Sequence, residues 1–303
     1  MAGTNAGQRP GRMKIGIVSA GKVGAVLGAA LRGAGHTIVG AYARSEASME
    51  RLENLLPGVP AAEIKDISVA ADMILLAVPD DELGPLVDGM ARLGLFRQGH
   101  LVVHVAGRYG TSVLAPAVQS GAIALALHPA MTFTGTSLDL KRLIDCPIAV
   151  TGNAMFLPIG EALAVEMEGR AVVVAEEDRG LYHAALCHGA NHVVTLVTQA
   201  MRMLEAAGIE DPGGYLGPLV EASLDGALRS GEALLTGPVV RGDAGTVADH
   251  LQAVDALAAT GDDVDIPVTY RSLAWATAKR AEQRRVLRPE QVEELEKLLD
   301  EGE

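Results

Sequence analysis

The sequence predicts an α/β protein, in which a doubly wound parallel sheet is followed by an all-helical domain. Three observations support this class. Short apolar runs alternate with helical stretches through residue 176, a glycine-rich turn follows the first run, and apolar residues recur at helical spacing from Glu177 onward. We therefore expect a tail over residues 1–12, a sheet domain over 13–176 and a helical domain over 177–303.

Seven apolar runs predict the strands of the sheet. The runs are rich in valine, isoleucine and alanine and are apolar at nearly every position, as expected for parallel strands that are buried on both faces. In chain order they cover residues 14–19, 37–44, 72–79, 100–106, 122–129, 147–152 and 171–175.

The helical domain is expected to open with a long helix over residues 180–208. Further helices are predicted at 216–234, 244–260 and 267–285. A last helix starts near Pro289, which suits the first turn because no backbone N–H is needed there. The polar start of the chain, residues 1–12, has no periodicity and predicts a disordered tail.

Composition limits the partners. The chain has 38 acidic and 25 basic residues, a formal net charge of -13, which disfavours nucleic acid and anionic membranes. No stretch reaches the roughly 18 apolar residues of a membrane span.

Lys22 interrupts the apolar run that follows Arg9 and Arg12, so we predict no signal peptide. The two cysteines, Cys146 and Cys187, lack metal-ligand spacing, and we expect a soluble cytoplasmic protein without a metal site.

The stretch "GIVSAGKVG", residues 16–24, is typical of a turn that binds a dinucleotide. In the pattern G-x-G-x-x-G, Ser19 replaces the first glycine, and a serine suits that position if its φ is negative. Gly21 lets the backbone approach the pyrophosphate, and Gly24 lets the helix pack on the strand. We predict a Rossmann-type fold whose cofactor loop consists of Ser19, Ala20, Gly21, Lys22, Val23 and Gly24.

The end of the second predicted strand decides which nicotinamide cofactor is preferred. An acidic residue there would bind the ribose hydroxyls of NAD, but this chain has Arg44 and Ser45. A guanidinium group beside a hydroxyl suits the 2′-phosphate of NADP, although Arg44 is also compatible with a solvated loop charge. Val78 and Pro79 are expected to pass under the ribose and nicotinamide, and Asp81 is expected to cap the next helix.

Four further segments carry a resemblance to a known family. They are "ILLAVPDDEL", "HPAMTF", "YHAALCHGANH" and "LLTGPVVRGDAGTVADHL". Together they resemble an uncharacterised, actinobacterial-type family that pairs a Rossmann-like domain with a helical domain of unknown function. The resemblance covers nearly the whole chain after the tail.

More distantly, the layout is similar to the β-hydroxyacid dehydrogenase superfamily, which includes 6-phosphogluconate dehydrogenase, ketopantoate reductase and pyrroline-5-carboxylate reductase. This similarity implies a helical C-terminal domain of the 6-phosphogluconate dehydrogenase type, hydride transfer linked to NADP, and a homodimer formed through the helical domain. Those relatives carry K-x-x-x-N early in the long helix. Here Asn191 matches the asparagine, but Cys187 stands at the lysine position.

A histidine is therefore expected to do the acid–base work, because its ordinary pKa lies near neutrality. His188 and His183 are the two proton-donor candidates, with Asn191 as a further catalytic residue. On an α-helix, His188, Asn191 and Thr195 would share a face. Each histidine is also compatible with a hydrogen-bonded core position.

Two residues are predicted to bind the substrate. His128 ends a strand at the carboxyl edge of the sheet, where open α/β folds place ligands, although it is also compatible with a loop-ordering hydrogen bond. Arg241 offers a guanidinium group for a substrate carboxylate, or for an acidic residue across a dimer interface. Asp243 is expected to cap the helix that starts at Ala244.

These observations predict an NADP-dependent oxidoreductase that acts on a small, carboxylate-bearing 2-oxo or imino compound, with ketopantoate as the first substrate to test. The alternative is a non-catalytic sensor or assembly protein, favoured by the missing lysine and by Ser19. A prephenate-dehydrogenase-like enzyme is a third interpretation, based on "HPAMTF" alone.

Overall fold

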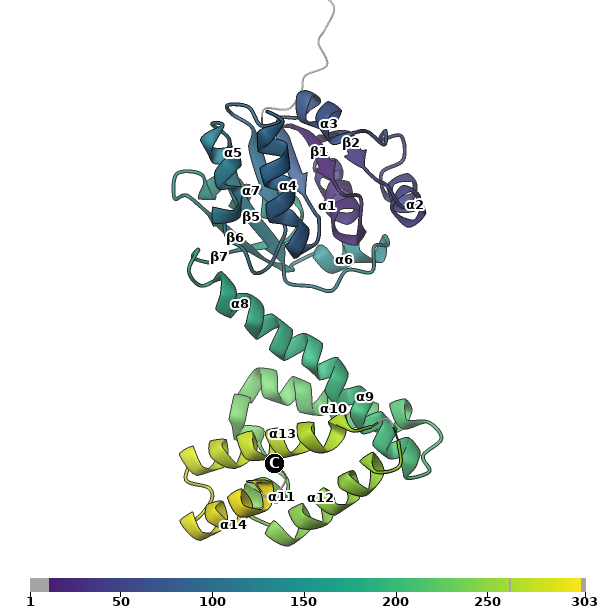
Figure 1. Cartoon of the computed structure of the whole chain (residues 1–303), viewed down its shortest axis with the longest axis vertical. Helices are drawn as coiled ribbons and strands as arrows, with labels where there is room; N and C mark the ends of the chain where they lie inside the picture. Colours follow the sequence, from purple (N-terminus) through teal and green to yellow (C-terminus); the bar gives the residue numbers. More distant parts are fainter. Residues whose placement is uncertain (1–10, 262, 301–303) are drawn as a thin grey trace, which may run out of the picture. The chain divides into compact units, whose positions relative to one another are not determined.

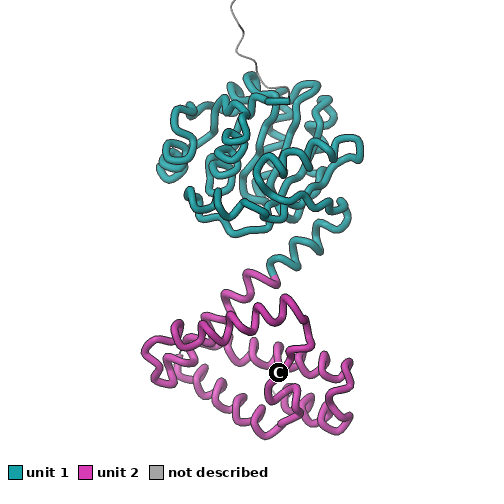
Figure 2. Tube along the Cα trace, turned by 180° about the vertical axis from the view of Figure 1, so that it is seen from behind, with its two compact units in different colours: residues 1–187 teal, residues 188–303 magenta. Residues whose placement is uncertain are grey.

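The computed structural model describes residues 11–261 and 263–300, so the predicted disordered tail lies almost entirely outside the described residues. The chain forms two compact units, residues 1–187 and 188–303 (Figures 1 and 2). The domain boundary expected at 176/177 stays a prediction. The compact units divide later because the helix that follows the sheet remains bonded to it, as described below.

The first unit is built on one seven-stranded sheet with the order β2-β1-β3-β4-β5-β6-β7. Six of the seven predicted runs contain one of its strands, and the seventh, 171–175, overlaps β7, which begins one residue earlier. They are β1 (Lys14–Val18), β2 (Thr37–Tyr42), β3 (Met73–Leu76), β4 (Leu101–His104), β5 (Ile123–Pro129), β6 (Pro147–Gly152) and β7 (Arg170–Val173).

The sheet is mostly parallel, which confirms the predicted class, and one pair of neighbouring strands is antiparallel. β6 pairs with β5 in antiparallel register, with His128 opposite Ala149, and β7 then runs parallel to β6. The link between β5 and β6 holds only the short helix α6 (Leu138–Leu143), which contacts α1 rather than crossing the sheet. The chain consequently re-enters the sheet at the edge where it left, and Ala130 N–H donates to the carbonyl of Pro147 at 2.8 Å.

Helices cover both faces of the sheet (Figure 1). Alternate strand residues explain this arrangement, because Ile17 faces one core cluster and Val18 the other. The first face packs against α1 (Lys22–Gly33), α6 and α7 (Leu157–Glu166), with α2 (Glu46–Leu55) beside α1. The second packs against α3 (Ile64–Ala70), α4 (Asp80–Arg92) and α5 (Ala115–Gln119).

The second unit is helical in its described part. Its buried core consists of apolar side chains of α11, α12, α13 and α14 with Leu287. The helices are α9 (His192–Ala206), α10 (Pro212–Ser230), α11 (Pro238–Arg241), α12 (Ala244–Ala258), α13 (Asp265–Gln283) and α14 (Pro289–Asp300). Pro289 begins α14, and Asp243 caps α12 by accepting from Thr246 N–H at 3.1 Å, so both predictions are confirmed.

The helix predicted over 180–208 is not regular. It consists of α8 (Arg179–Leu186), a π-helical turn (Cys187–Asn191) and α9. The predicted common face of His188, Asn191 and Thr195 assumed α-helical spacing, which the wider π turn changes. No helix in the described part of the chain is long and apolar enough to cross a bilayer.

Candidate functional site

The glycine loop joins β1 to α1 at the carboxyl edge of the sheet, and its two glycines do different things. A Cβ on Gly24 would lie 2.1 Å from the carbonyl oxygen of Ser19 and 3.0 Å from the Cβ of Ala77. Helix and strand approach too closely there for any side chain. A Cβ on Gly21 would meet only the hydroxyl of Ser19, at 3.4 Å, so the space over Gly21 is open to a ligand.

Ser19 occupies the first glycine position with a φ of 83°, so the expectation of a negative φ was wrong. The turn requires the left-handed backbone that glycine adopts without cost. A serine held there stores about 1 kcal/mol of backbone strain. The turn therefore has the backbone conformation that the glycine motif requires, and Ser19 in place of glycine only makes this conformation less stable.

The loop and the end of β2 border a cleft of about 550 Å³. Of the predicted cofactor residues, six line it: Ser19, Ala20, Gly21, Arg44, Ser45 and Val78. Gly21 N-caps α1 without any side-chain hydrogen bond, and the first turn of α1 has no acidic residue. The free N–H groups of this helix end therefore point to where an anion is stabilised. Lys22, exposed at the first position of α1, adds a positive charge.

Cationic and hydroxyl side chains also line this cleft. Arg51 and Ser48, which sequence reasoning missed, line it together with Arg44 and Ser45. Within residues 11–261 and 263–300, no ion pair involves either arginine. Ser45 caps α2 by accepting from Ser48 N–H at 3.2 Å. The helix that Ser45 caps is the missed signal, because Arg51 lies less than two turns into it and lines the same cleft.

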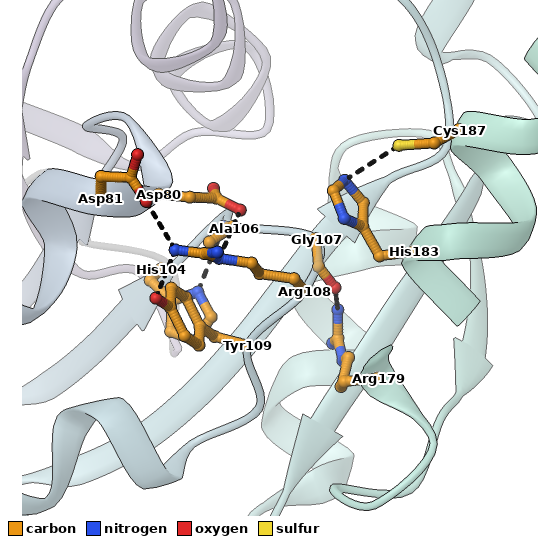
Figure 3. A network of polar contacts seen from close by, with 10 residues as sticks. All are labelled: Asp80, Asp81, His104, Ala106, Gly107, Arg108, Tyr109, Arg179, His183 and Cys187. Carbon is orange, nitrogen blue, oxygen red and sulfur yellow. Dashed lines mark hydrogen bonds and ion pairs between the residues drawn. The ribbon is translucent and has the colours of Figure 1, made fainter. Parts of the chain in front are cut away.

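Three other predicted positions are placed differently. Val23 packs against the core rather than the cleft, and Pro79 is the N-cap of α4. Asp81 does not cap α4 as predicted. Its carboxylate accepts from Arg108 at 2.7 Å, and Arg108 also lies 3.5 Å from Asp80 (Figure 3). The prediction failed because the ion pair comes from a loop that is distant in sequence.

A second cluster of polar side chains lies where β4 and β5 end. His104 is fully buried, with Nε2 at 2.7 Å from the carbonyl oxygen of Gly110 and Nδ1 accepting from Ala106 N–H at 3.2 Å. These partners fix a neutral ring with its proton on Nε2. Burial lowers the pKa of His104 to about 4.

His128, the predicted substrate residue at the end of β5, meets two residues of α8. Its Nδ1 lies 2.8 Å from the hydroxyl oxygen of Tyr182, and its ring centroid lies 6.0 Å from that of His183. Burial, with the charge of Arg179 next in importance, lowers the pKa of His128 to about 4. His183 in turn lies 3.8 Å from the Sγ of Cys187 (Figure 3).

Gly107 explains how these imidazole rings fit beside the loop that follows β4. A Cβ at this position would lie 2.5 Å from the Cδ2 of His183 and 2.9 Å from the Nε2 of His128. Only a glycine therefore allows both rings to approach the backbone. The carbonyl oxygen of Gly107 points the other way, to Arg179 at 3.5 Å (Figure 3).

Arg179, in the first turn of α8, is 1% exposed. Its guanidinium group donates to the carbonyl oxygens of Ala126 at 3.1 Å and Ala149 at 3.2 Å and to the hydroxyl of Thr151 at 2.8 Å. No carboxylate in the described part of the chain forms an ion pair with it. Arg179 thus anchors α8 to β5 and β6 and places a buried positive charge 5.6 Å from the ring of Tyr182, with the Glu176 carboxylate near enough to offset part of that charge.

Glu176 completes this cluster. Its carboxylate accepts from Thr111 N–H at 2.6 Å and from Ser112 N–H at 2.9 Å. These hydrogen bonds, opposed by desolvation, hold the pKa of Glu176 below its ordinary value. They also tie the segment before α8 to the loop after β4.

The remaining predicted site residues belong to the second unit. His188 and Asn191 are exposed, and His188 Nδ1 lies 3.2 Å from Nδ1 of His192. Arg241 is exposed at the end of α11, where its carbonyl accepts from Gln291 at 3.0 Å. Their roles stay predictions.

Sequence reasoning missed His104, Arg179 and Glu176. A signal exists for His104, because a histidine ends a buried apolar strand just before "VAG". Arg179 and Glu176 stand in the charged stretch "EEDRG", which has the composition of a solvated loop and gives no sign of burial. In residues 11–261 and 263–300, no group of three His, Cys, Asp or Glu residues is arranged to hold a metal ion.

Comparisons with family profiles agree with this architecture. Residues 1–129 match a Rossmann-like domain, and residues 146–277 match a domain of unknown function (DUF2520). The chain combines these two domains. The resemblance to an uncharacterised family with this pairing is confirmed. No curated protein matches the chain.

Solved structures share the fold at low sequence identity. A Bacteroides fragilis protein assigned as an NADP oxidoreductase has a TM-score of 0.70 at 20% identity, covering 88% of this chain and 98% of its own. An imine reductase of Myxococcus stipitatus, in complex with NADP+, has a TM-score of 0.59 at 20% identity, with 89% and 93% covered. A pyrroline carboxylate reductase of Plasmodium falciparum with NADP bound has a TM-score of 0.54 at 13% identity, with 88% and 98% covered.

Proposed function

We propose that this protein is an NADP-dependent oxidoreductase. The observation that carries the proposal is the cleft beside α1, which joins an uncapped helix N-terminus to two arginines without ion-pair partners among the described residues, Arg44 and Arg51. A pyrophosphate suits the helix end, and a 2′-phosphate suits the arginines. Positions 42–45, "YARS", offer no carboxylate for the ribose hydroxyls of NAD.

The predicted cofactor residues have consistent roles in this proposal. Gly21 leaves room for the pyrophosphate, Lys22 adds charge beside it, and Gly24 and Val23 fix the helix against the strand. Val78 and Pro79 would lie under the ribose and nicotinamide. Two similar structures hold NADP, which supports this cofactor.

The proposed substrate is a small, carboxylate-bearing compound with a carbonyl or imine group. When bound, the reduced cofactor supplies a hydride, and the protein must supply a proton. His128 and His183 lie together at the end of β5, the edge where ligands bind in open α/β folds. Arg241 is proposed to bind the carboxylate, with His188 and Asn191 as further catalytic candidates.

Titration calorimetry tests the cofactor. We expect NADPH to bind more tightly than NADH, and Arg44→Ala to weaken NADPH binding by about 10-fold or more with little effect on NADH, since a hydrogen bond to a charged group is worth about 1.5–3 kcal/mol. Arg92→Ala, an exposed arginine at the end of α4, is the matched control. No heat with either nucleotide refutes the proposal.

Turnover separates the enzyme from the alternative of a non-catalytic sensor, which the cysteine at the lysine position favours. The assay follows NADPH oxidation with ketopantoate, pyrroline carboxylate and related acids. Binding of NADPH without reduction of any of these compounds supports the sensor and contradicts the enzyme.

A homodimer formed through the helical domain is also proposed. Its support is a set of large apolar side chains that are exposed on α9, α10 and α13 of the single chain: Leu196, Tyr215, Leu219, Leu228, Val268 and Trp275. Light scattering should give a dimer that Leu228→Asp weakens. The control Leu93→Asp changes another strongly exposed leucine, in the first unit, and should not affect the mass.

A further inference from the structure

We propose that Tyr182, held by His128 and the buried guanidinium group of Arg179, is the residue that delivers the proton to the substrate. This inference rests on the proposed reductase function and names the acid for it. It differs from the sequence-based expectation that His183 or His188 donates the proton.

The hydrogen bond between Tyr182 and His128 is the first support. The hydroxyl oxygen and Nδ1 are 2.8 Å apart, and the rings meet edge to face with centroids 5.7 Å apart. Burial keeps His128 neutral near pH 7, since its pKa lies at about 4. In the tautomer with the proton on Nδ1, His128 donates to the phenol oxygen and leaves the phenol's own proton free for a substrate.

Arg179 is the second support. A negative charge on the phenol oxygen is costly in a partly buried place, and burial does raise the pKa of Tyr182. The positive charge of Arg179, whose Cζ lies 5.6 Å from the ring centroid of Tyr182, lowers the pKa of Tyr182 and so opposes the effect of burial. No carboxylate among the described residues forms an ion pair with Arg179, and Glu176 offsets its charge only from a greater distance. The guanidinium group can therefore stabilise a negative charge that develops on the phenol oxygen.

The position of the pair is the third support. Tyr182 and His183 both come from the start of α8, and they meet His128 where β5 ends and where the Gly107 loop leaves β4. Parallel strands β3, β4 and β5 end at this same edge of the sheet, as does the cofactor loop after β1. Ligands of doubly wound folds bind along that edge.

The proton that Tyr182 gives to the substrate is replaced through His128 from solvent. As the substrate carbon gains its hydride, the O–H bond of Tyr182 breaks and an O–H or N–H bond forms on the adjacent substrate atom. The phenolate then takes the Nδ1 proton of His128, while Nε2 of the same ring accepts a proton from solvent. The pair returns to its starting charge, with the ring in its other tautomer until the proton exchanges back.

Tyr182→Phe tests the proposal, since it removes one oxygen and keeps the ring. We expect kcat to fall about 100-fold or more with an unchanged Kd for NADPH. His128→Gln should lower kcat similarly, and the double variant should be no slower than the slower single variant, because the two residues act as one unit. His183→Ala should retain more activity than either.

The chain offers a matched control. His250 Nδ1 lies 2.7 Å from the hydroxyl of Tyr270 in the second unit, which is a pair of the same chemistry at nearly the same distance. Tyr270→Phe should leave kcat unchanged. Histidine 15N NMR of the full chain gives a readout without turnover, since Tyr182→Phe should shift the imidazole signals that disappear in His128→Gln.

The outcomes are distinguishable. A folded Tyr182→Phe protein with wild-type kcat, or with unshifted His128 signals, overturns the relay and leaves the reductase assignment in place. A wild-type protein that binds NADPH but reduces no carbonyl or imine acceptor overturns both.

Discussion

The hydroxyl oxygen of Tyr182 lies 2.8 Å from Nδ1 of His128, although 54 residues separate the two in the chain. The contact brings the first turns of α8 to the end of β5. It depends on two neighbours that have no reactive role themselves, the glycine at 107 and the arginine at 179.

Protein stability should fall as the pH drops from 6.5 to about 4. Burial lowers the pKa of His104 from 6.5 to about 4, so in this window the unfolded chain binds a proton that the folded protein excludes. The stabilisation is fully present above pH 6.5 and is lost toward pH 4, by up to about 3 kcal/mol for this fully buried ring. His128, which is partly exposed, should contribute less in the same direction.

Urea unfolding measured across this pH range checks the prediction. His104→Gln should lower the free energy of unfolding at pH 7 and should also flatten its dependence on pH. If the slope between pH 4 and 6.5 is the same in wild type and variant, His104 is not the responsible group.

Gly24→Ala should destabilise the first unit by about 1–3 kcal/mol and weaken NADPH binding. The added methyl group would lie 2.1 Å from the carbonyl oxygen of Ser19, and backbone cannot move aside as a flexible side chain can. Gly33→Ala in the same helix is the control, because nothing lies within 4 Å of its Cβ. That change should raise stability by about 0.5–1 kcal/mol. Equal melting temperatures for the two variants contradict the close contact.

Ser19→Gly should stabilise the protein by about 0.5–1 kcal/mol, because glycine relieves the positive φ and this gain exceeds its greater entropy when unfolded. Ser137→Gly provides the comparison, since Ser137 is exposed and has a φ of -62°. It should lower stability slightly. Denaturant midpoints of both variants decide the matter, and a less stable Ser19→Gly protein argues against strain at this turn.

Gly107→Ala should lower turnover by about 100-fold while NADPH still binds. A methyl group here would push against the rings of both His128 and His183 and displace them from the substrate. Gly89→Ala in α4, where nothing lies within 4 Å, should leave turnover unchanged. Unaltered kcat in Gly107→Ala is evidence that neither ring takes part.

Sequence patterns predicted the strands because a strand such as β3 or β4, which is buried throughout, must be apolar along its length. The expected burial of the 171–175 run was wrong, because β7 lies at the edge of the sheet and is mostly exposed. The patterns did not predict the reversal of β6, since "PIAVTG" is equally suited to either direction and only the path of residues 130–146 decides it. The glycine loop was recognised from its spacing. The backbone at Ser19 was not, because residue type gives a preference for φ and the surrounding turn imposes the value.

The candidate site was predictable only in part. Arg44, Ser45 and His128 follow strand ends, so the sheet alone brings them to one edge. Tyr182 and Arg179 reach that edge by tertiary packing of α8, which local periodicity does not describe. The predicted roles of His188, Asn191 and Arg241 depend on the second unit and stay predictions.

Glu176 has a consequence for catalysis that extends beyond its own hydrogen bonds. Its carboxylate accepts hydrogen bonds from the backbone N–H groups of Thr111 and Ser112 in the loop. Arg179 and Tyr182 follow Glu176 in the chain at intervals of about one helical turn. These hydrogen bonds hold the loop that contains Gly107 in place relative to the start of α8, which carries the phenol of Tyr182. The acid is therefore preorganised. The conformational entropy needed to orient its side chain is lost when the chain folds and not in each catalytic cycle.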